Sequence, residues 1–245
     1  MRRKPTVNND MTNQDYIEKL RQIRTPILYD AMEKFNVRPR TEGLMDTSIR
    51  PLLPSLGVMT GYATTAKVVG ALPPADGERI ISPREVWQYV QRSPSPNVMV
   101  VQDLDQPAAR SCAWGDVAAS IFLRLGCVGA ITNGGARDLR EVEALGFHLF
   151  APAPVVGHAH IRFVEIDTPV TVGSLVVHAG DLIHGDEHGV MVVPNEIPLD
   201  KLIPFVTEFL ASEKTIVDCC QQPEFDIDKL CKIVDEHNER TTGHL

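Results

Sequence analysis

The chain has 245 residues, of which 43% are hydrophobic and 23% are charged, and its formal net charge is −8 at pH 7. This length and composition are typical of a globular protein with a full hydrophobic core, and the acidic balance without a basic stripe argues against binding to nucleic acid or to an anionic membrane surface. No apolar run approaches the roughly 20 residues that cross a bilayer. Five cysteines without metal-ligand spacing favour a reducing, cytoplasmic setting.

The N-terminal half alternates predicted helices and strands. Residues 1–14 are expected to be a flexible tail, and residues 16–35 a helix interrupted at Thr25 and Pro26, where Thr25 can cap and Pro26 can occupy the first helical position. Residues 36–56 are predicted to be a loop. The next predicted elements are a strand over 61–69, a helix over 83–92, a strand over 97–103, a helix over 115–126, a strand over 128–132, a helix over 137–145 and a strand over 148–151. This alternation predicts a parallel sheet with right-handed crossovers.

The second half changes character. Between residues 155 and 194, β-branched segments are broken by Gly173, Gly180 and Gly185, a pattern typical of an antiparallel meander. Residues 199–220 and 226–237 are predicted to be helical. The simplest architecture is therefore one α/β domain with a long C-terminal helical arm.

Asp116 follows Gly115 at the predicted start of a helix. One interpretation is a cap that interacts with the helix dipole. The other is functional: the amides of Asp116, Val117 and Ala118 bind an anion while the Asp116 carboxylate faces a cation.

The segment Asn133-Gly134-Gly135-Ala136-Arg137-Asp138 follows a predicted apolar strand and precedes a helix. This is the end of a strand at which α/β sheets place their ligands, and two glycines allow close approach of the backbone. The alternative is a plain turn, with Asp138 as a helix cap and Arg137 in a surface ion pair. Neither a dinucleotide-binding fingerprint nor a P-loop is present, so nucleotide binding is not supported.

Several histidines and carboxylates outside this segment favour structural roles. His184 and His188 flank two carboxylates and suggest zinc, but the glycines and flanking strands favour a β turn. His158 and His160 are predicted to share a strand face without a third ligand. Lys67 shows no pattern of a Schiff-base lysine. The first interpretation of the C-terminal helix is that it exposes a solvated face with Glu208, Glu213 and Lys214. A glutamate on such an arm could also reach a neighbouring subunit.

The chain resembles the RraA-like family, which includes the 4-hydroxy-4-methyl-2-oxoglutarate and 4-carboxy-4-hydroxy-2-oxoadipate aldolases and the ribonuclease E regulators. The resemblance is carried by Trp114-Gly115-Asp116 and by Gly126-x-x-Gly129-Ala130-x-x-Asn133-Gly134-Gly135-Ala136-Arg137-Asp138. It extends to 25–31, 61–65 and 179–194, and covers roughly residues 15–215. The chain departs from the family in having Ala179 in place of the usual proline, an insert at 81–96 and an extension beyond Pro223.

The resemblance implies a fold and an assembly. The expected fold is a single α/β/β sandwich of the swivelling-domain type over residues 15–222, followed by a helical extension over 223–245. The expected assembly is a homotrimer or homohexamer with active sites at subunit interfaces.

The resemblance also implies a set of site residues. Mg²⁺ or Mn²⁺ would be held by Asp138 and waters, with Asp116 beside the metal ion. Arg137 would bind the carboxylate and the carbonyl of the substrate. Trp114, Gly115, Asp116 and Val117 would complete the substrate site. A neighbouring subunit would supply Glu213, and Asp116 or Glu213 would polarise a water that acts as the general base.

These residues together predict a divalent-metal-dependent lyase, an aldolase or decarboxylase that cleaves a 4-hydroxy-2-oxo acid or an oxaloacetate-like substrate to give pyruvate. The cation and the guanidinium would both bind the 2-oxo acid. One rival hypothesis is a non-catalytic regulator that binds a ribonuclease or another protein. Another is an enzyme of the same fold that acts on a sugar acid.

Overall fold

The computed structural model describes residues 12–242, so the predicted tail over 1–14 lies mostly outside the described residues. Thr12 already caps the first helix, which begins at Asn13. The helices are α1 (Asn13–Leu20), α2 (Thr25–Glu33), α3 (Pro83–Arg92), α4 (Asp116–Arg124), α5 (Leu139–Leu145), α6 (Leu199–Cys220) and α7 (Ile227–Thr242), with a 3-10 turn η1 (Pro54–Leu56). The strands are β1 (Arg50–Pro51), β2 (Met59–Val69), β3 (Asn97–Asp103), β4 (Cys112–Trp114), β5 (Cys127–Thr132), β6 (Gly135–Ala136), β7 (His148–Ala151), β8 (Arg162–Ile166), β9 (Val170–Val172), β10 (Leu175–Val177), β11 (Leu182–Asp186) and β12 (Gly189–Val193).

The main sheet has the strand order β1-β7-β5-β3-β2-β11-β12, and β8 pairs with β2. β2, β3, β5 and β7 are parallel, whereas β11, β12 and β8 are antiparallel to their neighbours. Helices α3, α4 and α5 connect the parallel strands, as the alternation of predicted elements indicates. The predicted change from α/β to antiparallel strands near residue 155 is therefore confirmed, although these strands do not form one meander: β9 pairs with β10, β11 pairs with β12 and β2, and β8 pairs with β2.

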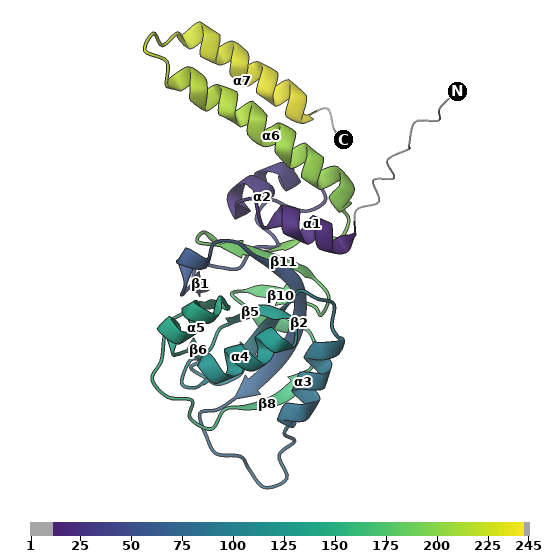
Figure 1. Ribbon diagram of the computed structural model, residues 1–245, viewed down its shortest axis with the longest axis vertical. Coiled ribbons are helices and arrows are strands. Elements are labelled where there is room, and N and C mark those ends of the chain that lie inside the picture. Colours follow the sequence, from purple (N-terminus) through teal and green to yellow (C-terminus); the bar gives the residue numbers. More distant parts are fainter. Residues whose placement is uncertain (1–11, 243–245) are drawn as a thin grey trace, which may run out of the picture.

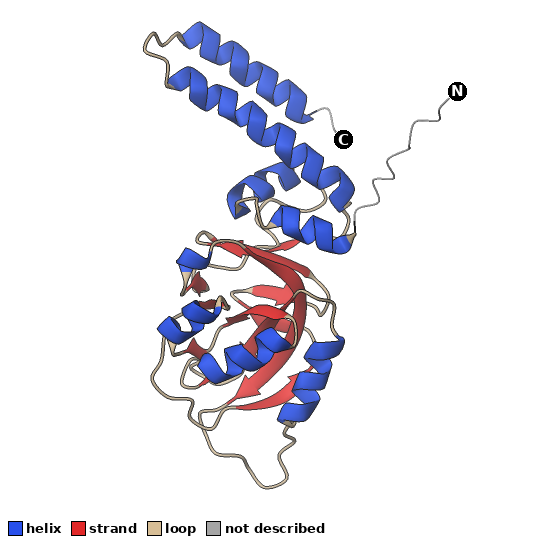
Figure 2. Cartoon of the chain, in the orientation of Figure 1, coloured by secondary structure: helices blue, strands red, loops and turns tan. Residues whose placement is uncertain are grey.

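The sheet is covered on both faces, which explains the nearly continuous apolar sequence of β3. Met99 and Val101 face a core formed with the helices, while Val98 and Val100 face a second core formed with β9 and β10. The layers are thus helices, main sheet and a small β layer (Figures 1 and 2), so the predicted α/β/β sandwich is confirmed.

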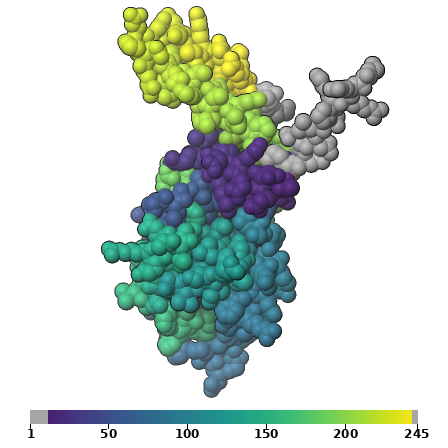
Figure 3. Space-filling model, viewed as in Figure 1, coloured from purple at the N-terminus to yellow at the C-terminus, as the bar shows by residue number. Residues whose placement is uncertain are grey.

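A third core joins α1, α2 and α6 to the β11–β12 end of the sheet. From there α6 extends away from the body and α7 folds back along it (Figure 3), so that the C-terminal arm is a helical hairpin. The Ser212 hydroxyl lies 2.8 Å from His237 Nδ1, and the rings of Phe209 and His237 are 5.3 Å apart. Among residues 12–242, no helix is long and apolar enough to span a membrane.

Two local predictions are wrong. Residues 36–56 hold β1 and η1 and are not loop throughout. Thr25 does not cap α2: Arg24 occupies the capping position, and Thr25 is the first helical residue, whose amide donates to Asp186 Oδ2 at 2.9 Å. The start of α2 is therefore capped by the Asp186 carboxylate from the β11–β12 hairpin, and not by a side chain next to it in the sequence.

His184 joins this helical layer to the sheet. Its ring is fully buried, with Nδ1 3.0 Å from the Thr25 hydroxyl and Nε2 3.1 Å from the carbonyl of Leu20. The carbonyl accepts only, so Nε2 carries the proton and Nδ1 accepts from the hydroxyl. Burial lowers the pKa of His184 to about 4, because a charged ring would lose its hydration.

We expect His184 to make stability fall as the pH is lowered. The unfolded chain takes up a proton below pH 6.5, whereas the folded chain takes it up only near pH 4, so protonation favours unfolding between these values. Between pH 7 and pH 5 the contribution is about 2 kcal/mol. Urea unfolding should show that His184→Gln loses correspondingly less stability than wild type over this range. His160→Gln, at an exposed position, should follow the wild-type pH dependence, and an unchanged dependence in His184→Gln would contradict the assignment.

Candidate functional site

A short parallel pairing brings the two predicted site segments together. Beside the main sheet, Cys112 pairs with Gly135 and Trp114 with Ala136, and the Arg137 amide donates to the Trp114 carbonyl at 2.9 Å. Gly135 belongs to β6, so the alternative interpretation of its segment as a plain turn is wrong. Both chain segments leave this pairing at the same end, so Gly115 and Asp116 lie beside Arg137 and Asp138.

Trp114 fixes the position of the first segment. Its ring is buried between Phe122 and Phe147, with centroids 5.0 and 5.7 Å away. Its carbonyl oxygen accepts a hydrogen bond from the Arg137 amide. Trp114 therefore lines the pocket from the core side and positions the Gly115 turn that follows it.

Gly115 makes room for the Asp138 carboxylate. A Cβ on Gly115 would lie 2.4 Å from Asp138 Oδ2, closer than real Cβ contacts allow. Asp138 itself has left-handed backbone angles, φ 55° and ψ 41°, which aspartate tolerates better than most residues. It occupies the N-cap position of α5, as one interpretation of the sequence expects, but its side chain makes no capping hydrogen bond there.

Asp138 Oδ2 is surrounded by groups of the site. It lies 3.3 Å from Arg137 Nε and accepts from the Asp116 amide at 3.4 Å. The side chains of Arg137 and Asp138 are 37% and 32% exposed, respectively, so both remain open to a ligand. Arg137 also donates to the carbonyl of Val156 at 3.5 Å, which directs the guanidinium along the pocket wall.

Asp116 is the first residue of α4, and its carboxylate oxygen Oδ1 accepts from the Val117 amide at 2.7 Å. Of the three amides that one interpretation assigns to an anion, those of Asp116, Val117 and Ala118, the first two are therefore not free. Protein carboxylates already occupy both amides, because Asp116 and Asp138 supply the negative charge that the helix start attracts.

These residues line a pocket of about 300 Å³ between α3, α4, β8 and the β4–β6 pair. Part of its lining was not predicted. Cys112 and Ile121 lie beside the predicted site residues on β4 and α4, whereas the other side chains come from segments far apart in the chain: Trp87, His158, Ile161 and Phe163. Spacing along the chain gives no signal for such residues. The predicted insert at 81–96, which supplies Trp87, contributes α3 to the main core. His158 and His160 are exposed, but they lie in a loop and not in the predicted strand.

Glu213 does not join this site within its own chain. It lies on α6 near Asp30 of α2 and His237 of α7. Burial, together with the negative charge of Asp30, raises the pKa of Glu213, whereas His237 and Lys34 oppose the shift. Its predicted role in a neighbouring subunit stays a prediction.

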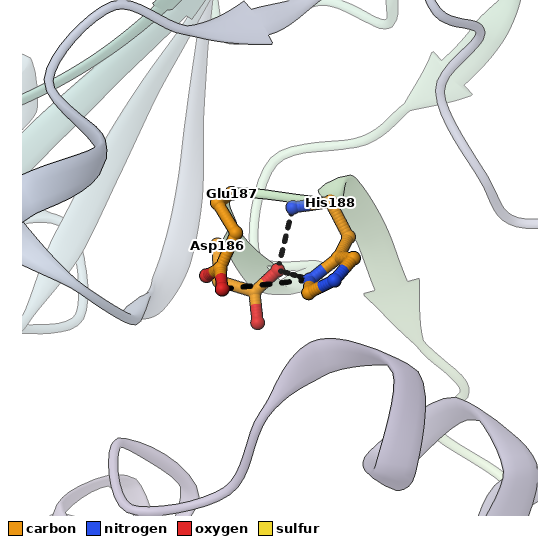
Figure 4. Close-up of side chains that lie close together, drawn as sticks. All are labelled: Asp186, Glu187 and His188. Carbon is orange, nitrogen blue, oxygen red and sulfur yellow. Dashed lines mark hydrogen bonds and ion pairs between the residues drawn. The ribbon is translucent and has the colours of Figure 1, made fainter.

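A second acidic cluster lies at the β11–β12 turn, where Asp186, Glu187 and His188 point toward one another (Figure 4). Asp186 is fully buried and accepts from the Thr25 amide and from both the amide and the ring of His188. Arg24 forms ion pairs with Asp186 and Glu187. Burial alone would raise the pKa of Asp186, but the hydrogen bonds from His188 and from the Thr25 amide hold the pKa below its usual value. Because Arg24 already compensates the charge, the cluster is a structural tie between α2 and the hairpin, and the predicted β turn is confirmed.

Lys67 and Cys127 also have structural roles. Lys67 Nζ lies 2.7 Å from Glu165 across the β2–β8 pair. Cys127 is fully buried, and burial raises the pKa of its thiol to about 12, so it stays protonated. The five cysteines are all free.

Comparisons with known proteins agree with this fold. A family model described as RraA-like, Aldolase/RraA, matches residues 25–192. A protein of Halalkalibacterium halodurans with the provisional name 4-hydroxy-4-methyl-2-oxoglutarate aldolase is 27% identical over 181 residues, which cover 74% of this chain and 77% of that protein.

Two solved structures share the fold at low identity. One is an uncharacterized protein from Pseudomonas syringae pathovar tomato, with 18% identity, a TM-score of 0.70 and coverage of 95% of this chain and 98% of that chain. The other is Streptomyces coelicolor RraAS2, described as an unusual member of the RNase ES inhibitor RraA family, with 20% identity, a TM-score of 0.63 and coverage of 87% and 99%. Because the family model spans more than half of the sequence, this chain belongs to the RraA-like family.

Proposed function

We propose that the protein is a divalent-metal-dependent carbon–carbon lyase that cleaves a 4-hydroxy-2-oxo acid, or decarboxylates an oxaloacetate-like acid, to release pyruvate. One observation carries the proposal: Asp138 and Arg137 lie in contact in an open pocket, with Asp116 beside them. An exposed carboxylate next to a guanidinium suits a substrate that binds a cation and an arginine at once. The relative named as an aldolase supports the same chemistry.

Asp138 is the residue that would hold the metal. Mg²⁺ and Mn²⁺ prefer oxygen ligands, and Mg²⁺ is commonly held by one or two carboxylates with several waters, so this donor set fits. The space left by Gly115 keeps the Asp138 carboxylate at the pocket surface. When bound, the cation supplies a Lewis acid that stabilises the negative charge developing on the 2-oxo oxygen.

Arg137 would bind the substrate carboxylate. Its Nε lies 3.3 Å from Asp138, so the guanidinium is held beside the metal ligand. A planar guanidinium can donate two parallel hydrogen bonds to a carboxylate and thereby fix the orientation of the 2-oxo acid. The bond to be cleaved would then be held in one orientation toward the pocket.

Asp116 is our candidate for moving the proton, through a water held at its carboxylate. The Val117 amide fixes this carboxylate at the edge of the pocket. Glu213 can take part only in a neighbouring subunit, because its own α6 lies elsewhere. We therefore also propose a homotrimer or homohexamer with the pocket near a subunit interface. The five free cysteines support a cytoplasmic location.

The alternative function is an RraA-type regulator that binds a ribonuclease or another protein partner. The family model joins aldolases and RraA proteins under one description, so the family does not distinguish the two functions. The presence of Asp116, Arg137 and Asp138 in one pocket favours the enzyme.

The first prediction tests the lyase directly. With Mg²⁺ or Mn²⁺, the protein should release pyruvate from oxaloacetate or from 4-hydroxy-4-methyl-2-oxoglutarate, and EDTA should abolish this release. Asp138→Asn should lower kcat/KM by at least about 100-fold, because it removes the charge that holds the metal while asparagine tolerates the same backbone angles. Circular dichroism should show an unchanged fold. Metal-independent turnover, or full activity of Asp138→Asn, would rule out this role, and turnover of neither these two acids nor any other 4-hydroxy-2-oxo acid would favour the regulator.

The second prediction concerns Gly115. Gly115→Ala should displace the Asp138 carboxylate, because the new methyl group overlaps Oδ2, and should weaken Mn²⁺ binding by at least about tenfold in calorimetry. Gly157→Ala is the matched control, since a Cβ there meets only one atom, at 4.0 Å. Equal Mn²⁺ affinity in the two variants would show that the contact with Gly115 does not position Asp138.

The third prediction concerns Arg137. Arg137→Lys keeps the charge but loses the planar pair of donors, so KM for the oxo acid should rise about tenfold. Mn²⁺ affinity, measured without substrate, should change much less than KM. A KM equal to that of wild type would exclude Arg137 as the carboxylate-binding residue.

A further inference from the structure

We propose that the substrate carries an apolar, preferably aromatic, group at the end remote from its 2-oxo acid, and not a second carboxylate. This inference rests on the proposed function, because it takes the oxo acid end to lie at Arg137 and Asp138. It concerns the opposite end of the same pocket, whose lining differs sharply in chemistry.

The charges of the pocket provide for one carboxylate only. Among the described residues that line it, Arg137 is the sole side chain with a permanent positive charge, whereas Asp116 and Asp138 are acidic. His158 is already engaged through Nδ1, which donates to the carbonyl of Ala159 at 2.8 Å. A second substrate carboxylate would therefore lose water without gaining a cationic partner, which is costly.

The pocket becomes apolar along α4. Asp116 and Val117 stand at the start of this helix, and Ile121 lies one turn further on the same side as Val117. Both Val117 and Ile121 line the pocket, so the pocket extends along α4, away from the charged residues at the start of this helix.

Aromatic and aliphatic side chains from other segments complete this end. Trp87 comes from α3 and Phe163 from β8, with Ile161 immediately before β8. Trp87 is 39% exposed and Val117 is 68% exposed, although both are large apolar residues beside a hollow. An apolar substrate group would cover them and lose its own contact with water at the same time.

The size of the effect follows from the behaviour of hydrophobic pockets. Such pockets distinguish substrates that differ by one methylene by roughly 10- to 200-fold. A phenyl group contributes more apolar surface than a methyl group, and stacking against an indole favours it further. We therefore expect a preference of at least about tenfold for an aryl group over a carboxylate.

Binding tests the inference without turnover. In Mg²⁺, the full-length protein should bind phenylpyruvate at least about tenfold more tightly than 2-oxoglutarate in calorimetry. Trp87→Ala should weaken binding of phenylpyruvate by at least about fivefold, and that of pyruvate, which has only a methyl group, much less. Phe225→Ala is the matched control, because Phe225 is an aromatic residue with 54% exposure that does not line this pocket.

Turnover provides an independent measurement. In 4-hydroxy-2-oxo-4-phenylbutanoate the C3–C4 bond breaks, the 4-hydroxyl loses its proton and C3 gains one, giving benzaldehyde and pyruvate. The same step on 4-hydroxy-2-oxoglutarate gives glyoxylate and pyruvate. The kcat/KM should be at least about tenfold higher for the phenyl substrate, and Ile121→Arg, which adds a cation at the apolar end, should reduce this ratio at least about tenfold.

The possible failures are distinguishable. Metal-dependent cleavage that favours 4-hydroxy-2-oxoglutarate, or equal binding of phenylpyruvate by wild type and Trp87→Ala, would overturn this inference and leave the lyase in place. Cleavage of neither substrate would overturn the lyase and, with it, this inference. A phenyl preference that Trp87→Ala removes and Phe225→Ala retains would support both.

Discussion

The site depends on the pairing of β4 with β6, one of the smallest sheets in the molecule. Without it, the Gly115 turn and the Arg137–Asp138 pair would follow separate connections and have no fixed relation. The hydrogen bond from the Arg137 amide to the Trp114 carbonyl joins them directly. Packing supports it, because Trp114 is held by two phenylalanine rings and Val155 fills the space against Gly135. A short piece of backbone is thus stabilised mainly by the core around it.

The pairing has an electrostatic consequence. It places the amide at the start of α4 and the guanidinium of Arg137 on the same carboxylate oxygen of Asp138. Two donors of partial or full positive charge fix the direction of that carboxylate, while its side chain stays partly open to solvent. The arrangement is therefore ready for a ligand before the ligand arrives, which reduces the free energy spent on ordering the site during binding.

Much of the fold follows from the sequence, because its strands and helices have clear apolar periods. The strand of residues 97–103 and the helix started by Ser82 appear as predicted, and the capping box at Ser82 is formed. The elements that were missed are those stabilised by distant partners. Two-residue strands have no period to detect, and Thr25 is bonded to residues about 160 positions away.

The same distinction applies to the site. The motif residues from Trp114 to Asp138 could be singled out because they form two dense local patterns. The pocket walls could not, since Trp87 and Phe163 are brought there by the packing of α3 against β8. The occupied Asp116 amide was also missed, because its acceptor is the carboxylate of Asp138, 22 residues further along the chain.

One part of the pocket wall comes from different segments of the chain than the charged floor. Trp87, Ile161 and Phe163 belong to segments that contribute nothing to the β4–β6 pairing. Exchanging any of them leaves the backbone bonds beneath Arg137 and Asp138 intact. Substitutions in this part of the wall can therefore change the shape and polarity of the pocket without rebuilding its charged floor.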